Sequence, residues 1–250
     1  MGGQPAKASL SLGASHFREA NQRLREALAA ADVVELRDVC AQRYLGCAMP
    51  AGKKLDVFGT PGNDMACFLD GGEVEVHGSA QDQVGNTMND GRIVIHGRCG
   101  DAAGYAMRGG KIFVRGNAGY RAGIHMKAYK EKKPIMIIGG TAGSFLGEYQ
   151  AGGVIIVLGL DSKDKRIVGN FPCTGMHGGK MFLRGECNDI EFPKQVTARP
   201  ADSGDLEELK VYLSEYCEVF GLELSKVLES PFTVVTPDSK NPYKQMYVAN

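Results

Sequence analysis

The sequence predicts an all-β fold: a single-stranded parallel β-helix of about seven coils, flanked on both sides by α-helices. Three consecutive segments repeat one pattern with closing glycines 19 residues apart, and they are Gly72–Gly78, Gly91–Gly97 and Gly110–Gly116. Apolar and polar residues alternate within each segment, which is the period of a β-strand. Since no helical pattern separates the repeats, we expect each strand to pair in parallel with its predecessor, about 4.8 Å away.

The alternation also predicts the core of the β-helix. The inward strand positions are Val74/Val76, Ile93/Ile95, Ile112/Val114, Ile155/Val157 and Met181/Leu183. A second column, expected to fill the interior from one wall, reads Leu69, Met88, Met107, Met126, Gln150 and Met176. A left-handed hexapeptide helix has a similar glycine spacing, but the coils are one residue longer than its period. The leucine spine of a leucine-rich repeat is absent.

The patterns divide the chain into three regions. Residues 1–51 are expected to be an N-terminal helix and lead-in, residues 52–195 the β-helix, and residues 196–250 a C-terminal helix with an extended tail. Coil length increases at Lys127–Lys133 and Asp161–Arg166, and both additions are charged. These additions predict loops that bulge from one side of the solenoid.

Each flanking region contains one amphipathic helix. The first is expected over His16–Ala31, capped by Ser15 and followed by a short strand at Val33–Leu36. The second is expected to start at Asp202 or Ser203 and to end at Phe220, because Gly221 supplies a C-terminal stop. After it we expect a short helical piece near 222–229. An extended tail over Ser230–Asn250, with Phe232, Tyr243 and Tyr247, is then expected to lie against its own solenoid or a partner.

One outward column of the strands turns from acidic to apolar along the axis. Its acidic start is Asp56 and Glu75. An apolar stripe of this kind must be covered. Either the chain's own helices cover it or it is a subunit interface, and the candidate partner-interface residues are Val94, Phe113, Met136, Ile156 and Phe182.

The search for chemistry yields no catalytic, cofactor-binding or metal-binding assignment. His77 and His96 occupy the same outward position in neighbouring coils, with Arg115 next in line. Stacked imidazoles of this kind could bind a metal, although a surface residue repeated with its coil is the more common case. The seven cysteines show no CxxC spacing, which argues against an iron–sulfur or zinc site held by this chain alone.

Composition excludes several classes of partner. Acidic and basic residues balance at 29 each, so binding to nucleic acid or to a membrane surface is not expected. The amino-terminal residues lack the pattern of a signal peptide, and no apolar run has the length of a membrane span. The cytoplasm is therefore the expected compartment.

Residues 85–126, GNTMNDGRIVIHGRCGDAAGYAMRGGKIFVRGNAGYRAGIHM, resemble the GXGXG β-helix domain. That domain forms the C-terminal region of the glutamate synthase large subunit, and it also occurs in one of the subunits of formylmethanofuran dehydrogenase. The resemblance covers about residues 50–190, and the stretches 34–64 and 229–247 resemble the stand-alone version of the domain. It implies a right-handed β-helix with a non-catalytic role.

The resemblance leads to a main hypothesis and two alternatives. The first is a structural subunit of a split glutamate synthase-like complex in nitrogen metabolism. Its partners would be a class II glutamine amidotransferase subunit and an FMN/iron–sulfur synthase subunit, which would carry the FMN and the clusters. The second is a scaffold subunit of a formylmethanofuran dehydrogenase-like complex. The third is a small metal-binding protein that uses His77 and His96. A homo-oligomer is also compatible with the pattern.

Overall fold

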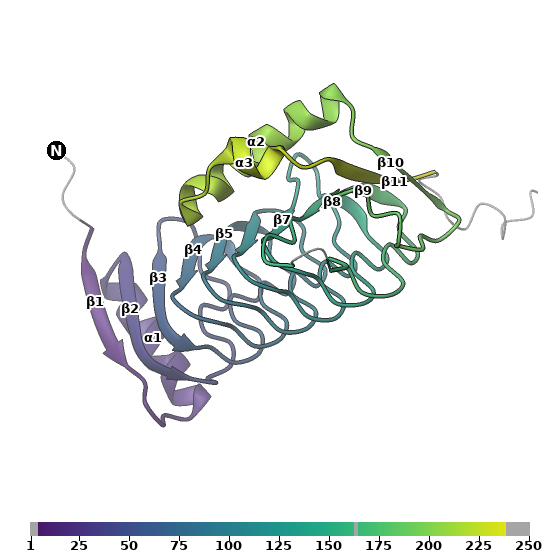
Figure 1. Ribbon diagram of the computed structural model, residues 1–250. Helices are drawn as coiled ribbons and strands as arrows, with labels where there is room; N and C mark the ends of the chain where they lie inside the picture. Colours follow the sequence, from purple (N-terminus) through teal and green to yellow (C-terminus); the bar gives the residue numbers. More distant parts are fainter. Residues whose placement is uncertain (1–4, 163–164, 239–250) are drawn as a thin grey trace, which may run out of the picture.

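One sheet runs along the whole molecule, and the rest of the chain is arranged around it (Figure 1). The computed structural model describes residues 5–162 and 165–238. The predicted all-β solenoid is confirmed, with about six turns. The strands stack in the order β1-β2-β3-β4-β5-β6-β7-β8-β9-β11-β10. They are β1 (Lys7–Ser11), β2 (Val33–Cys40), β3 (Lys54–Thr60), β4 (Asp70–Val76), β5 (Asp90–Ile95), β6 (Lys111–Val114), β7 (Ile135–Ile138), β8 (Ala151–Val157), β9 (Gly178–Arg184), β10 (Val196–Pro200) and β11 (Phe232–Pro237).

The parallel stack begins before the coil that the glycine pattern indicates, because β1 pairs in parallel with β2 and β2 with β3. Val34 of β2 aligns with Leu55 of β3, and Leu36 aligns with Val57. The predicted short strand at Val33–Leu36 is therefore the first half of an eight-residue strand. The segment after β2 keeps the corner glycine of the repeat: Gly46 O accepts the Met49 N–H, as Gly85 O accepts the Met88 N–H in a later coil.

The predicted core is confirmed on both walls of the interior. The inward strand residues named above are at most 1% exposed. The column from Leu69 to Met176 is equally buried, and it contains one polar member, Gln150. The Nε2 of Gln150 donates to the carbonyls of Gly152 and Gly153, at 3.2 and 3.3 Å. Within the described residues its Oε1 has no hydrogen-bond partner.

Helix α1 (Phe17–Ala30) closes the amino-terminal end of the interior. Its buried Ala20 and Leu24 belong to the same apolar cluster as the interior of the coils. The cap is His16, whose Nδ1 accepts a hydrogen bond from the backbone N–H of Arg18. The hydroxyl of Ser15, the expected cap, instead accepts a hydrogen bond from Arg23.

Two antiparallel strands end the sheet on the other side. β11 pairs with β9, and β10 pairs with β11. The segment expected to be an extended tail is thus a strand over Phe232–Pro237 that lies against its own solenoid. Tyr243 and Tyr247, further along that tail, lie outside the described residues.

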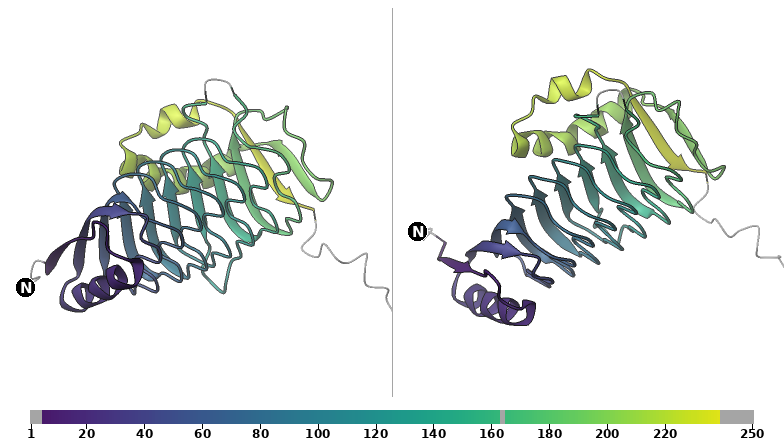
Figure 2. Two further views of the ribbon diagram at one scale, coloured as in Figure 1. Left: turned by 90° about the horizontal axis from the view of Figure 1, so that it is seen from below. Right: turned by 60° about the horizontal axis from the view of Figure 1, so that its bottom comes forward.

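Helix α2 (Ser203–Phe220) crosses the outer face of the sheet, followed by the short helix α3 (Leu224–Leu228) (Figures 1 and 2). Its predicted bounds are confirmed: Asp202 is the N-cap in a capping box, and Gly221 ends the helix in a left-handed conformation. The apolar face of α2 packs on the outward stripe of the strands. Ion pairs flank this contact, for example Lys180–Glu208 at 2.6 Å.

The docking of α2 is expected to depend on pH through Asp205, whose side chain is 5% exposed. Burial raises the pKa of Asp205, but hydrogen bonds from Arg199, the backbone N–H of Asp202 and Lys180 outweigh it and lower the pKa from 3.8 to about 2. The ionised carboxylate therefore stabilises the folded protein above pH 4, and this contribution is lost as the pH falls to 2. A pKa difference of this size between the unfolded and the folded protein corresponds to about 2 kcal/mol in the free energy of unfolding.

Urea unfolding between pH 5 and pH 2 measures this contribution. The free energy of unfolding of Asp205→Asn should fall less steeply with decreasing pH than that of wild type. The control is Asp161→Asn, because the Asp161 side chain is 75% exposed. Parallel curves for wild type and Asp205→Asn would contradict the assignment.

Candidate functional site

The chain's own helix covers the outward stripe that sequence analysis singled out. Val94, Phe113, Ile156 and Phe182 are at most 4% exposed and belong to one apolar cluster with Leu209, Leu213 and Tyr216 of α2. In the described structure these residues therefore do not form a partner surface. The alternative of cover by the chain's own helices is the one that the structure shows.

The assignment of Met136 to this stripe is wrong. Met136 is fully buried in the interior, and Ile137 takes the outward position between Phe113 and Ile156. The error comes from the double glycine that closes this coil. The backbone N–H of Gly140 donates to Gly116 O, and Gly159 N–H donates to Gly140 O, so Gly140 is the equivalent glycine. When strand positions are counted back from Gly139 instead of Gly140, the strand shifts by one residue, and its inward and outward residues are exchanged.

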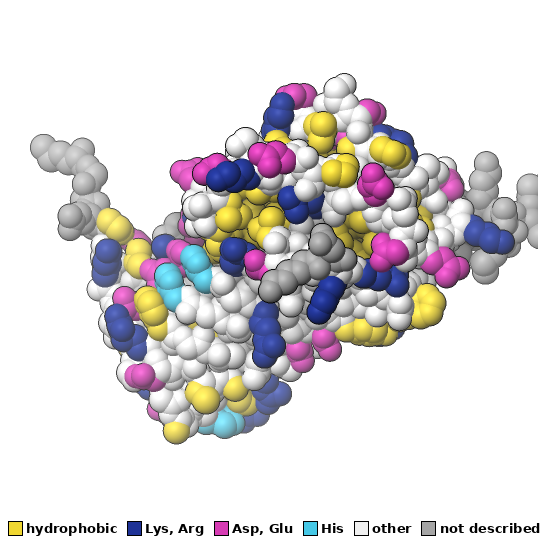
Figure 3. Space-filling view, viewed as in Figure 1, with side chains coloured by type: hydrophobic (Ala, Val, Ile, Leu, Met, Phe, Trp, Pro, Cys, Tyr) yellow, Lys and Arg dark blue, Asp and Glu magenta, His cyan; other side chains and the backbone are white. Residues whose placement is uncertain are grey.

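The structure places a carboxylate beside the two histidines. Among the described residues, Glu75, His77 and His96 form the one group of three His, Cys, Asp or Glu side chains with the spacing of a metal site, with ligand atoms within 4.8 Å of one another. Glu75 Oε1 lies 2.9 Å from His96 Nε2. Lys54 Nζ lies 3.2 Å from Asp56 Oδ1 and 3.1 Å from Glu75 Oε2. Figure 3 shows adjacent histidine side chains beside acidic groups near the amino-terminal end of the sheet.

Hydrogen bonding keeps this carboxylate ionised. Burial raises the pKa of Glu75, but hydrogen bonds from His96 and Lys54 outweigh that effect and leave the pKa below its usual value. Glu75 is therefore an anion at neutral pH. Sequence analysis identified the histidine pair but not this third group, although Glu75 stands two residues before His77 on the same strand face.

A surface of exposed aromatic side chains lies on the turns between the strands, in two stacks: Tyr120, Phe145 and Phe171 form one, and Tyr105 and Tyr149 form the other through His125. We call it the aromatic ridge. Tyr105, Tyr120 and Tyr149 are each 38% exposed and Phe171 is 61% exposed, whereas Phe145 between them is half-buried. The ridge residues are Tyr105, Tyr120, Phe145, Tyr149 and Phe171.

Ring stacking and a half-buried ion pair hold the ridge in place. Phe145 contacts Tyr120 and Phe171 with ring centroids 5.3 and 5.2 Å apart. The Arg121 guanidinium lies over Tyr120, at 4.8 Å, and over Phe145, at 5.4 Å. Arg121 Nε also lies 2.7 Å from the carboxylate of Glu148, whose side chain is 9% exposed. The ridge is therefore a preorganised surface.

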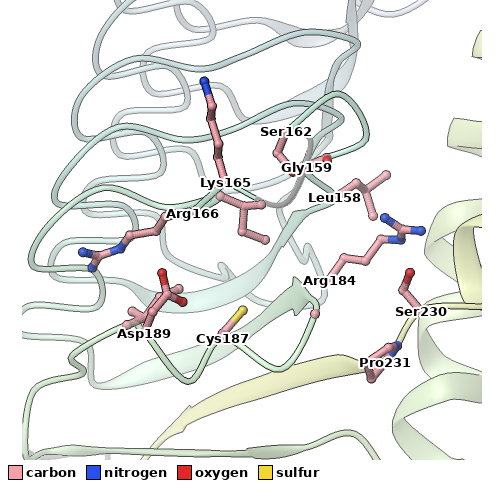
Figure 4. A pocket seen from close by; sticks show the side chains of 13 residues that line it. Leu158, Gly159, Ser162, Lys165, Arg166, Arg184, Cys187, Asp189, Ser230 and Pro231 are labelled. Atoms are coloured by element: carbon pink, nitrogen blue, oxygen red, sulfur yellow. Dashed lines mark hydrogen bonds between the residues drawn. The ribbon is translucent and has the colours of Figure 1, made fainter.

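A hollow of about 310 Å³ opens at the carboxyl-terminal end of the solenoid (Figure 4). Lys165, Arg166 and Arg184 line it together with Cys187 and Asp189. Arg184 already donates to the backbone carbonyl of Val227. Burial raises the pKa of the Cys187 thiol, so this thiol is protonated at neutral pH and a poor nucleophile.

The other six cysteines lie in the coils of the solenoid, except Cys217, which lies in α2. Cys67, Cys99, Cys173 and Cys217 are buried, whereas Cys40 and Cys47 are exposed. Burial raises the pKa of the Cys99 and Cys173 thiols to about 12.

Comparison with known proteins places this solenoid in a family. The GXGXG motif family matches residues 33–238, from the first residue of β2 to just beyond β11. The chain belongs to the GXGXG motif family. A relative, Uncharacterized protein MJ1350 of Methanocaldococcus jannaschii, is 41% identical over 244 residues, which cover 93% of each chain.

A solved structure shares the fold of this solenoid. It is a chain of the formyltransferase/hydrolase complex (FhcABCD) of Methylorubrum extorquens, determined in complex with methylofuran. The TM-score is 0.58 at 17% identity, and the match covers 93% of this chain and 91% of that chain. A likeness at this identity concerns the fold. Among the described residues of this GXGXG protein, no helix has the length and hydropathy of a membrane span.

Proposed function

We propose that this protein is a scaffold subunit of a multi-subunit enzyme complex of the formyltransferase/hydrolase type, and that it has no catalytic role by itself. The similar solenoid of FhcABCD is part of a multi-subunit complex, and the two chains match over nearly their whole length. In this proposal the solenoid is a rigid rod whose outer surfaces hold neighbouring subunits at fixed positions.

The aromatic ridge is the observation that carries this proposal. Tyrosine, phenylalanine and arginine are enriched at the cores of protein–protein interfaces, and tyrosine and arginine are frequent hot spots. Phe171 is 61% exposed although it stacks on Phe145, so a large apolar surface faces outward on an ordered support. Since α2 covers the outward stripe of the sheet, the ridge is an apolar surface that stays available for a partner.

A split glutamate synthase-like complex is the second candidate function. Its support is the resemblance of residues 34–64 and 229–247 to the stand-alone GXGXG domain, in addition to the family match. The partners would then be a class II glutamine amidotransferase subunit and an FMN/iron–sulfur synthase subunit. FMN and the clusters would be bound by those partners, not by this chain.

Binding to purified candidate subunits tests both versions. The formyltransferase/hydrolase subunits, and separately the amidotransferase and synthase subunits from the same genome, are mixed with this protein and analysed by size-exclusion chromatography and calorimetry. Co-elution with the first set supports the leading proposal, and co-elution with the second set supports the alternative. A protein that stays alone with both sets would count against a scaffold role.

Substitutions in the ridge are expected to weaken this association at least tenfold. Phe171→Ser combined with Tyr149→Ser removes two exposed rings, and a tenfold loss corresponds to about 1.4 kcal/mol. The matched control is Val211→Ser, because Val211 is a lone hydrophobic residue on α2 that is 73% exposed. Calorimetric titration of the partner measures wild type and both variants. Equal affinities for the control and the double variant would refute the ridge as the binding surface.

A further inference from the structure

We infer that Glu75, His77 and His96 form a binding site for a divalent transition-metal cation of the Zn²⁺ type. The site would cross-link two neighbouring coils of the solenoid on their outer face. This inference does not depend on the proposed function, because it rests on side chains of this chain alone.

The strand register brings the three ligands together. Glu75 lies near the end of β4 and His77 directly follows that strand, two residues on, so both side chains point to the same outer face. His96 follows β5 at the position equivalent to His77, because Val76 pairs with Ile95. The resulting ligand atoms lie within 4.8 Å of one another. Two imidazole nitrogens and a carboxylate oxygen are a ligand set that Zn²⁺ uses, with a fourth position open to water.

Aromatic neighbours hold both imidazole rings in position. The His77 ring stacks on Phe58, with centroids 4.3 Å apart and planes inclined by 11°. The His96 ring is parallel to His77 within 11°, at 5.4 Å, and meets the edge of Phe220 at 5.4 Å. Phe220 is the last residue of α2, so the carboxyl end of that helix, which favours positive charge, lies beside His96.

The charges around the site also favour a cation. The Asp56 carboxylate lies beside His77, and the Glu75 carboxylate lies beside His96. The ammonium group of Lys54 contacts both carboxylates. Lys54 thus occupies the position of a counter-ion that a metal would replace. Its side chain is 37% exposed, so it can swing into solvent when a metal binds.

The ligand atoms already lie near the spacing that a bound metal ion requires. Donor atoms about 2.0–2.1 Å from a tetrahedral ion lie roughly 3.3 Å apart. The existing pair of Glu75 Oε1 and His96 Nε2, at 2.9 Å, is already closer than that. The ligand atoms of the cluster lie at most 4.8 Å apart, so the ring nitrogen of His77 must move toward the other two ligand atoms by at most about 1.5 Å. The side chains of His77 and His96 are 33% and 36% exposed, which leaves access for the ion and for a water ligand.

Titration of the untagged, full-length protein with Zn²⁺ and with Co²⁺ tests the inference. Calorimetry is expected to show one ion per chain, and Co²⁺ should give the visible spectrum of a tetrahedral site. His96→Ala and Glu75→Gln should each weaken binding at least tenfold. His125→Ala is the matched control, because His125 is an exposed histidine stacked on Tyr149, outside the cluster.

A second variant separates metal binding from a general loss of structure. Lys54→Met removes the competing ammonium group and should tighten Zn²⁺ binding severalfold, which damage to the fold would not do. Wild-type protein that binds no stoichiometric Zn²⁺ or Co²⁺ overturns the inference. The same conclusion follows if His96→Ala binds as tightly as His125→Ala, or if Lys54→Met weakens binding.

Discussion

Gly91→Ala is expected to unfold the solenoid under conditions in which the wild type is stable. Gly91 has a φ of +102°, which side-chain-bearing residues rarely adopt. A Cβ at this position would lie 2.2 Å from the carbonyl oxygen of Gly72 in the preceding coil. Because the clashing atom belongs to the backbone, no rotation of a side chain relieves the contact. We expect a loss of more than about 4 kcal/mol, the range of exceptional single substitutions.

Gly185→Ala is the control that isolates the clash between coils. Gly185 has a φ of +112°, similar to that of Gly91, but nothing lies within 4 Å of its would-be Cβ. This variant therefore carries the backbone strain alone, about 1–2 kcal/mol. Urea unfolding followed by circular dichroism measures both variants. Equal losses of stability in the two variants would show that the clash with the preceding coil does not add to the cost of Gly91→Ala.

Tyr216→Ala is expected to release helix α2 from the sheet. Tyr216 is fully buried, and its ring meets the edge of Phe113, with centroids 5.7 Å apart. Its hydroxyl donates to the carbonyl of Val114. Truncation of a buried aromatic residue costs about 3–5 kcal/mol. The variant should bind a hydrophobic dye and should be cleaved by protease within α2, because the stripe beneath the helix becomes exposed.

Tyr216→Phe separates the contribution of the ring from that of the hydroxyl. The Val114 carbonyl also accepts the backbone N–H of Gly139, at 2.8 Å, so it keeps a partner when the hydroxyl is removed. The expected loss is therefore only about 1 kcal/mol, without dye binding. Thermal unfolding and dye fluorescence compare the two variants. A Phe variant as unstable as the Ala variant would mean that the hydrogen bond, not ring packing, holds α2.

The sequence predicts the repeat well and its interruptions poorly. Alternation and glycine spacing identify the regular coils, because each residue there repeats the environment of the residue one coil before. The pattern fails at Met136, where a second glycine shifts the count by one. It also fails at β10 and β11, whose antiparallel pairing depends on contacts between segments more than 30 residues apart.

The candidate sites were predictable to different extents. His77 and His96 repeat with the coil, so a periodic search finds them, whereas Glu75 joins them only through the position of its side chain. The aromatic ridge has no period, because its rings come from different positions of their coils. Tyr105 and Tyr149, for example, meet through His125, which lies between them in the stack. Only the three-dimensional structure brings such residues into one surface.

The two ends of the sheet also determine whether molecules can join into fibres. A solenoid that ended on a parallel strand at both ends could add a second copy to either edge and continue the stack. Here β11 and β10 reverse the strand direction at one end, and β10 carries Arg199 and Pro200. At the other end, β1 is only five residues long and begins with Lys7. The reversed strands, the charges and the proline oppose head-to-tail polymerisation and keep the rod at the length of one chain.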